Sequence, residues 1–215
     1  MLLAAMAMQP DADCQLCPRL VAHRQVLRAR EPGWFNTPVP AFGDEQGWLA
    51  IVGLAPGERG ANRTGRPFTG DASGELLYRT LSDLGLSSGS YGGTVDDGLT
   101  LNGALIVNAV RCLPPANKPD SAEIHQCRPF LKEQLRGMPH LKVVLALGQV
   151  AHQSALKALG GKLPKHPFGH GAVHRLHTGY TLVDSYHCSR YNQNTGRLTG
   201  EMFREAVKAA IAARA

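Results

Sequence analysis

Four of the five cysteines have a spacing that suits a metal ion or a cluster. Cys14 and Cys17 form a C-x2-C pair, and Cys112 and Cys127 follow much later as a C-x14-C pair. Four thiolates fit either zinc or a [4Fe–4S] cluster, and the spacing alone does not decide between them. An odd number of cysteines argues against a disulfide framework, and the fifth, Cys188, is interpreted as a small packing residue.

A glycine-rich loop carries an aromatic ring and a carboxylate. The loop spans 53–74, follows the apolar run 48–52 and contains Phe68 and Asp71. Glycine lets a ligand approach the backbone closely, so such a loop at the end of a strand is a natural ligand cradle. The phosphate-binding patterns G-x-x-x-x-G-K-[ST] and G-x-G-x-x-G are absent, which disfavours mononucleotide binding. Asp71 could also be only a turn or helix-capping carboxylate.

Two further polar side chains close apolar runs elsewhere in the chain. Asn108 lies in the run 104–110, and His187 ends the run 181–187. In open parallel sheets, ligands bind beyond the carboxyl ends of the strands. If these runs form one parallel sheet, the ring and carboxylate of the loop meet an amide and an imidazole in one crevice. Such groups suit a planar, hydrogen-bonding ligand such as a nucleobase.

The elements that position these residues alternate between strand and helix. This pattern predicts an α/β fold with three layers, α/β/α, around a central four-stranded parallel sheet. A single domain is expected over 1–215, with 1–13 as a frayed N-terminus and 87–103 as a loop. The predicted strands are 48–52, 104–110, 143–148 and 181–187, with a hairpin arm over 173–180. The predicted helices are 19–30, 73–84 (capped by Ser73), 120–136 (with a capping box of Asp120 and Glu123), 149 to about 160, and 200–213.

Length and charge narrow the class of protein. The chain has 215 residues and a formal net charge of +6, which favours an anionic partner, nucleic acid first. The first residues lack the basic region of a signal peptide, and no apolar run approaches a membrane span. A cytoplasmic monomer without a membrane partner is therefore expected.

Four motifs together resemble one known family, the uracil-DNA glycosylase superfamily. They are G-L-A-P-G at 53–57, N-R-T-G-R-P-F-T-G-D-A-S-G at 62–74, N-A-V-R-C at 108–112 and H-C-S-R-Y-N-Q-N-T-G-R-L-T at 187–199. The match is closest to the iron–sulfur type-B branch, family 5, and runs roughly from Cys14 to the closing helix. This resemblance implies the fold of that superfamily and an enzyme that initiates base excision repair. Such an enzyme flips out a uracil or damaged base, hydrolyses its N-glycosidic bond and leaves an abasic site.

The resemblance also implies a role for each matching residue. Leu54 stands where the superfamily often has a polar catalyst, a departure typical of the type-B branch that shifts this role to Asp71. His187 resembles the second-motif histidine, although Cys188 replaces the usual proline of H-P-S. The implied catalytic residues are Asp71, Asn108 and His187. The implied base-binding residues are Gly53, Leu54, Ala55, Phe68, Asn108 and His187, with Phe68 stacking on the base.

Substrates, DNA contacts and cofactor follow from the same resemblance. An apolar Leu54 makes the pocket less selective among bases, so hypoxanthine, xanthine and ethenocytosine are expected beside uracil. Double-stranded DNA is the expected substrate, with single-stranded DNA as a further candidate. The expected DNA contacts are Arg63, Arg66, Arg111, Lys118, Ser189, Arg190, Tyr191 and Asn192. The resemblance favours a [4Fe–4S] cluster, of structural role, on Cys14, Cys17, Cys112 and Cys127. No lysine lies in the motifs, so strand cleavage through a Schiff base is not expected.

Other interpretations remain open at this level. One is a non-catalytic iron–sulfur module that binds DNA or senses damage, and another is a family-4-like glycosylase strict for uracil. The histidines at 166, 170, 174 and 177 could suggest a metal site, but a hairpin would spread them apart, so that reading is disfavoured.

Overall fold

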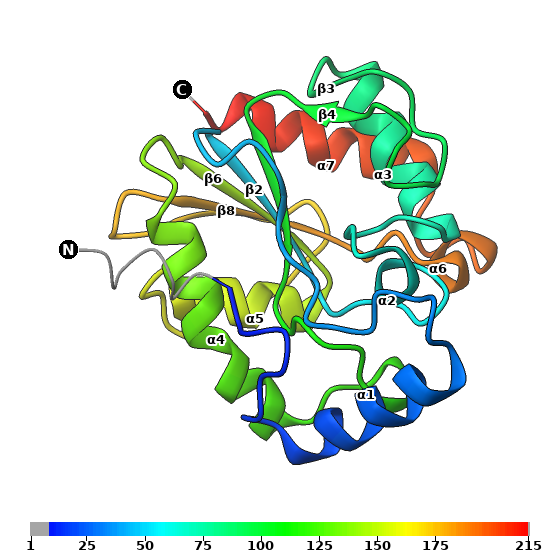
Figure 1. The fold of residues 1–215 in the computed structure, drawn as a ribbon. Helices are drawn as coiled ribbons and strands as arrows, with labels where there is room; N and C mark the ends of the chain where they lie inside the picture. Colours follow the sequence, from blue (N-terminus) through cyan, green and yellow to red (C-terminus); the bar gives the residue numbers. More distant parts are fainter. Residues whose placement is uncertain (1–8, 215) are drawn as a thin grey trace.

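A six-stranded mixed sheet forms the centre of the computed structural model, which describes residues 9–214 (Figure 1). The strand order is β1-β5-β2-β6-β8-β7. The four central strands run parallel, while β1 and β7 pair antiparallel at the edges. The predicted α/β fold with four parallel central strands is confirmed, and two edge strands extend it. The strands are β1 (Phe42–Gly43), β2 (Leu49–Gly53), β5 (Ala104–Asn108), β6 (Val143–Leu147), β7 (Val173–Arg175) and β8 (Thr181–Ser185).

The central strands are buried on both faces. Every residue of β2, β5 and β6 is buried, as expected for continuous apolar runs in a parallel sheet covered on two sides. The register pairs Gly53 of β2 with Asn108 of β5 at their carboxyl ends. The glycine-rich loop and the candidate amide therefore start side by side.

Helices form the two outer layers. Helices α3 (Ala72–Asp83) and α7 (Gly200–Ala212) cover one face, and α4 (Ser121–Arg136) and α5 (Gln149–Ala158) cover the other (Figure 1). The apolar residues divide accordingly into two large clusters, one on each face of the sheet. A smaller cluster joins α1 (Pro18–Arg30) to α4 and to Val110 beyond β5.

Two strand ends and one loop differ from the sequence-based expectation. Strand β5 ends at Asn108 rather than at residue 110, and β8 ends at Ser185, so His187 lies in the following loop. The segment 87–103, expected to be a loop, contains a short antiparallel pair, β3 (Ser87–Ser88) and β4 (Thr100–Leu101). Pairs of two residues are too short for a periodic pattern to reveal.

Helix caps decide where α3 and α4 begin. The carboxylate of Asp71 accepts hydrogen bonds from the backbone N–H groups of Ser73 and Gly74, so Asp71 and not Ser73 is the N-cap of α3. The predicted capping box of Asp120 and Glu123 is confirmed at α4. The side chain of Asp71 thus stabilises the start of α3.

The described part of the N-terminal segment is packed against the body of the protein. Gln9 donates a hydrogen bond to Gln134 at 3.2 Å, and Asp13 pairs with Arg28 at 2.6 Å. The expectation of a frayed start is therefore wrong for residues 9–13, and residues 1–8 lie outside the described part. No described helix is long and apolar enough to cross a membrane.

Candidate active site and cysteine site

A cavity of about 640 Å³ opens at the carboxyl ends of the central strands. It lies where the loops after β2, β5 and β8 converge, as expected for an open parallel sheet. The cavity brings together the side chains that the sequence singled out: Leu54, Ala55, Phe68, Asp71, Asn108 and His187. Gly53 lies behind its wall, where an added Cβ would come within 2.4 Å of Asn108 Oδ1 and 2.8 Å of the Phe68 ring.

Phe68 presents its ring at the cavity from an unusual backbone conformation. Its φ angle is +53°, in the left-handed region that bulky residues seldom adopt. The ring is only 7% exposed and lies 5.7 Å from the imidazole of His187, at 27° to it. Two flat side chains therefore border the cavity in nearly parallel planes.

Asn108 lines the cavity and carries an unsatisfied polar atom. Its side chain is 3% exposed, and its Oδ1 atom has no hydrogen-bond partner among residues 9–214. A buried amide oxygen without a donor destabilises the folded protein, so such a group in a cavity wall points to a ligand that supplies the donor. An N–H group of a nucleobase is such a donor.

Asp71 uses its two carboxylate oxygens differently. Oδ1 accepts the two backbone N–H groups that begin α3, at 2.9 and 3.3 Å. Oδ2 lies against Gly57 and Gly60, where added Cβ atoms would come within 3.1 and 2.3 Å of it. The capping and catalytic interpretations are therefore compatible, because one oxygen orients the carboxylate and the other lies against Gly57, which lines the cavity.

His187 is held by the segment that follows it. Asn192 Nδ2 donates to the His187 carbonyl at 2.8 Å, and Ser189 caps α6 (Arg190–Asn194) by accepting from the Asn192 N–H. Burial lowers the pKa of His187, and the nearby charge of Asp71 partly opposes this shift. The imidazole is therefore neutral near pH 7 and can donate one hydrogen bond to a ligand.

Two predicted DNA contacts are wrong because the arginines are buried. Arg66 is 5% exposed and forms a two-pronged ion pair with Asp97, at 2.6 and 2.8 Å. Arg111 is 0% exposed, and its guanidinium reaches Gln9 and Gln134 instead of the surface. Sequence patterns show that a cation is present but not which way it points.

The remaining predicted contacts lie where DNA could reach them. Arg63 and Arg190 are exposed, while Lys118, Ser189 and Tyr191 line the cavity, and Tyr191 is 72% exposed. Ser189 and Asn192 are half-buried and tie their loop together, so their main contribution is to its shape.

Part of the cavity wall comes from residues outside the motifs that the sequence singled out. Ala116 and Asn117 line the cavity beside Lys118, in the 3-10 helix η2 (Pro115–Asn117). Both have positive φ angles, +54° and +56°. The asparagine between prolines was the available signal, since asparagine tolerates the left-handed region better than most residues.

Comparison with known proteins identifies the family. The sequence model of the uracil-DNA glycosylase superfamily matches residues 40–211. The chain belongs to this superfamily. It is therefore an enzyme of the uracil-DNA glycosylase type, a hydrolase acting on N-glycosyl bonds.

Its curated relatives include several of one branch of that superfamily. The type-5 uracil-DNA glycosylase of Thermus thermophilus is 47% identical over 200 residues, which cover 90% of each chain. The type-5 enzyme of Pyrobaculum aerophilum is 41% identical, over 93% of this chain and 88% of that one. A type-4 enzyme of the same organism is 33% identical, but over only 59% of this chain and 57% of the other.

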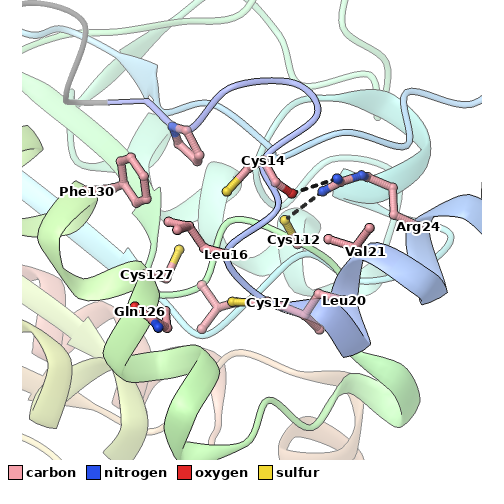
Figure 2. A pocket seen from close by; sticks show the side chains of 12 residues that line it. Cys14, Leu16, Cys17, Leu20, Val21, Arg24, Cys112, Gln126, Cys127 and Phe130 are labelled. Carbon is pink, nitrogen blue, oxygen red and sulfur yellow. Dashed lines mark hydrogen bonds between the residues drawn. The ribbon is translucent and has the colours of Figure 1, made fainter.

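A second cavity of this superfamily member contains the four cysteines that the sequence grouped together. Cys14, Cys17, Cys112 and Cys127 line it, and none forms a disulfide (Figure 2). Figure 2 shows their sulfur atoms among apolar side chains from α1, α4 and the N-terminal segment: Leu16, Leu20, Val21 and Phe130.

Hydrogen-bond donors point at two of these sulfur atoms. The Cys127 sulfur accepts from the Arg111 backbone N–H at 3.3 Å, and the Cys112 sulfur accepts from the Arg24 guanidinium at 3.7 Å. Burial, with the neighbouring cysteines, raises the pKa of Cys17 to about 11 and that of Cys112 to about 12. Thiolates in this cavity therefore need a bound cation or cluster to stabilise them.

The four sulfur atoms are not gathered as closely as the ligands of one bound zinc ion would be. No three potential ligand atoms that include a described cysteine sulfur lie within 4.8 Å of one another. Four thiolates bonded to a single zinc at about 2.3 Å would lie about 3.8 Å apart.

Two of the four histidines, His166 and His174, are not spread apart as expected, and they lie at the β7 edge of the sheet. The rings of His166 and His174 lie 5.6 Å apart, and His152 and Asp184 complete a cluster that the sequence did not reveal. Asp184 bonds to His152 Nδ1 at 2.7 Å, to His174 Nε2 at 3.1 Å and to the Gly169 N–H at 3.2 Å. These hydrogen bonds tie α5, β7 and β8 together just before His187 in the chain.

Proposed function

We propose that this enzyme removes uracil from DNA, together with hypoxanthine, xanthine and ethenocytosine, and leaves an abasic site that starts base excision repair. The observation that carries the proposal is the unpartnered amide oxygen of Asn108, a residue that lines the same cavity as Phe68, Asp71 and His187. The printed names of the relatives, type-5 uracil-DNA glycosylases, support uracil as a substrate.

Recognition would take place on a base that has left the double helix. An enzyme that acts on a base must flip it out of the stack, and a ring such as Phe68 replaces part of the lost stacking, worth about 1–3 kcal/mol per base. Asn108 Oδ1 accepts an N–H of the base. The cavity wall at Leu54 is apolar and imposes no hydrogen-bond pattern, which supports acceptance of several damaged bases.

The chemistry would divide between Asp71 and His187. As the N-glycosidic bond breaks, its electron pair leaves with the base and positive charge develops on the sugar. The neutral imidazole of His187 donates a hydrogen bond to the departing anion, as an oxyanion donor does. Asp71 Oδ2 orients a water molecule toward C1′ of the sugar, stabilises the cationic sugar and accepts the proton that the water releases.

DNA would be held at the mouth of the same cavity. Arg63, Lys118 and Arg190 are exposed cations that suit phosphate contacts. Tyr191, which is largely exposed beside the cavity, has the position and size to enter the space that the flipped nucleotide leaves.

We further propose that Cys14, Cys17, Cys112 and Cys127 hold a [4Fe–4S] cluster. The four thiols of one cavity, its mostly apolar lining and the N–H donors on two sulfurs all suit such a cluster. It would join the N-terminal segment to α4 and to the loop after β5, and it supplies no step of the hydrolysis.

A panel of end-labelled oligonucleotides tests the function. The intact protein is incubated with duplexes and single strands containing uracil, hypoxanthine, xanthine or ethenocytosine, and abasic sites are revealed by alkali. Base release from uracil and at least one other lesion is expected. Release from uracil alone would contradict the broad specificity, and no release from any strand would contradict the function. Because Lys118 borders the cavity, borohydride trapping without alkali checks that no Schiff base forms.

A further inference from the structure

The short segment that carries Phe68 is fastened by groups from outside the glycine-rich loop. Tyr91 lies between β3 and β4, and its hydroxyl donates to the Phe68 carbonyl and accepts from the Gly70 N–H, both at 3.2 Å. Tyr78 of α3 donates from its hydroxyl to the Pro67 carbonyl at 2.6 Å. Two backbone carbonyls and one backbone N–H around Phe68 are thus hydrogen-bonded to two tyrosines.

A buried ion pair fixes the start of the same segment. Arg66 Nε donates to Thr69 Oγ1 at 2.7 Å, and its two terminal nitrogens bond to Asp97, which also lies between β3 and β4. Asp97 in turn accepts the backbone N–H groups of Gly92 and Leu99. The guanidinium also lies over three aromatic rings, those of Phe42, Tyr78 and Tyr91.

The packing around the Phe68 carbonyl leaves no spare room. A Cβ added to Gly74 would come within 1.8 Å of that oxygen and 2.5 Å of the Tyr91 hydroxyl. Phe68 itself has a φ of +53°, which a bulky residue adopts only when its surroundings impose it. The surroundings here are α3 and the β3–β4 segment, 87–101.

We infer that the β3–β4 segment is a clamp that sets the position of the Phe68 ring, with Tyr91 as a positioning residue that acts through Phe68. The inference rests on the proposed function, in which Phe68 stacks on the flipped base. Without the Tyr91 hydroxyl, the 66–70 segment can leave the left-handed conformation and the ring no longer stays on the cavity wall. The clamp thus determines how well the cavity holds a base, without touching it.

A double-mutant cycle tests whether Tyr91 acts through Phe68. The variants are Tyr91→Phe, Phe68→Ala and the double variant, with Tyr180→Phe as a control that removes a hydroxyl remote from the cavity, beside Leu159 and Thr178. Tyr91→Phe is expected to lower the single-turnover rate of base release about fivefold to tenfold, the loss of one or two hydrogen bonds. In the Phe68→Ala background, Tyr91→Phe should cause no further loss of this rate. Additive losses, or an equal loss in Tyr180→Phe, would overturn the clamp.

Hydrogen exchange provides a readout that does not depend on activity. The Gly70 N–H, which bonds to Tyr91, is expected to exchange faster in Tyr91→Phe and at the native rate in Tyr180→Phe. Unchanged exchange at Gly70 would overturn the clamp even if the enzyme is active. A wild-type protein that releases no base would instead overturn the proposed function, while the exchange result would still decide on the clamp.

Discussion

The base cavity and the cysteine cavity lie on two sides of one short segment of chain. The backbone N–H of Val110 donates to the Leu54 carbonyl on the base side, while the Val110 side chain packs with Leu20 and Cys127 on the other. The base cavity presents a carboxylate, an amide oxygen and an imidazole, one of them without a partner. The cysteine cavity presents sulfur atoms in an apolar lining.

This difference separates a site for a passing ligand from a site for a permanent one. Polar groups with unused hydrogen-bonding capacity favour a ligand that brings its own donors and then leaves. The sulfur atoms come from the start of α1, the loop after β5 and α4, so the proposed cluster would join distant parts of the chain and contribute to folding. Changes on the base side should therefore alter the rate, and changes on the cysteine side should alter stability.

The sharpest test on the base side is Asp71→Asn. Losing the carboxylate is expected to lower base release by about 10²–10⁴-fold, because the water molecule and the cationic sugar lose their anionic partner. Asparagine is as good an N-cap as aspartate, so the free energy of unfolding should hardly change. Single-turnover kinetics and thermal unfolding of the same preparation measure both effects.

Asp71→Ala is the matched variant that removes the cap as well. It should be as slow as Asp71→Asn and about 1 kcal/mol less stable. Full activity in the asparagine variant would show that residue 71 is only a helix cap, and would leave a non-catalytic DNA-binding module as the better interpretation.

Two single substitutions compare the role of a buried cation near the base cavity with that of an exposed cation. Arg66→Gln leaves Asp97 buried without its partner and should cost about 3–5 kcal/mol of unfolding free energy. Lys118→Gln should change stability by less than about 0.5 kcal/mol, but weaken DNA binding and lower its salt dependence by about one ion. Chemical denaturation and titration of labelled duplex at several salt concentrations test both. A stable Arg66→Gln variant that binds DNA poorly would reverse the assignment of Arg66.

On the cysteine side, Cys112→Ser should lower stability before it affects chemistry. Losing a ligand whose concentration is a thousand times its dissociation constant lowers the free energy of unfolding by about 4 kcal/mol. This corresponds to a thermal midpoint about 8–16 °C lower. Iron content and absorbance at about 400 nm should fall as well. Cys188→Ser is the control, since Cys188 is buried but outside this cavity. Zinc in place of iron in the wild-type protein would contradict the proposed cluster.

The sequence predicted the central strands and both cavities because local signals encode them. Continuous apolar runs marked β2, β5, β6 and β8, and the rule that ligands bind at the carboxyl edge then placed Phe68, Asp71, Asn108 and His187 together. The cysteine pattern likewise singled out four residues that line one cavity.

What the sequence could not predict depends on contacts between distant residues. Arg66 is buried because Asp97, 31 positions away, comes from the β3–β4 segment. Asp184 gathers His152 and His174 from two neighbouring elements. Neither Asp97 nor Asp184 belongs to a periodic pattern or a motif of fixed spacing. The direction and burial of such side chains therefore become visible only in the folded structure.

The smallest expected effect concerns the pH dependence of the base cavity. Because burial lowers the pKa of His187, the folded protein keeps this imidazole neutral at pH values where the unfolded chain protonates it. Stability from this group is complete above the unfolded pKa of about 6.5 and declines as the pH falls toward the folded value. A histidine with an ordinary pKa would be only about one quarter neutral at pH 6. Single-turnover base release at pH 6 should therefore stay well above one quarter of its value at pH 8. Any loss of rate that His187 does cause between pH 8 and pH 6 should be absent in His187→Gln. A fourfold loss at pH 6 that His187→Gln abolishes would mean that the imidazole titrates normally and that its burial does not keep it neutral.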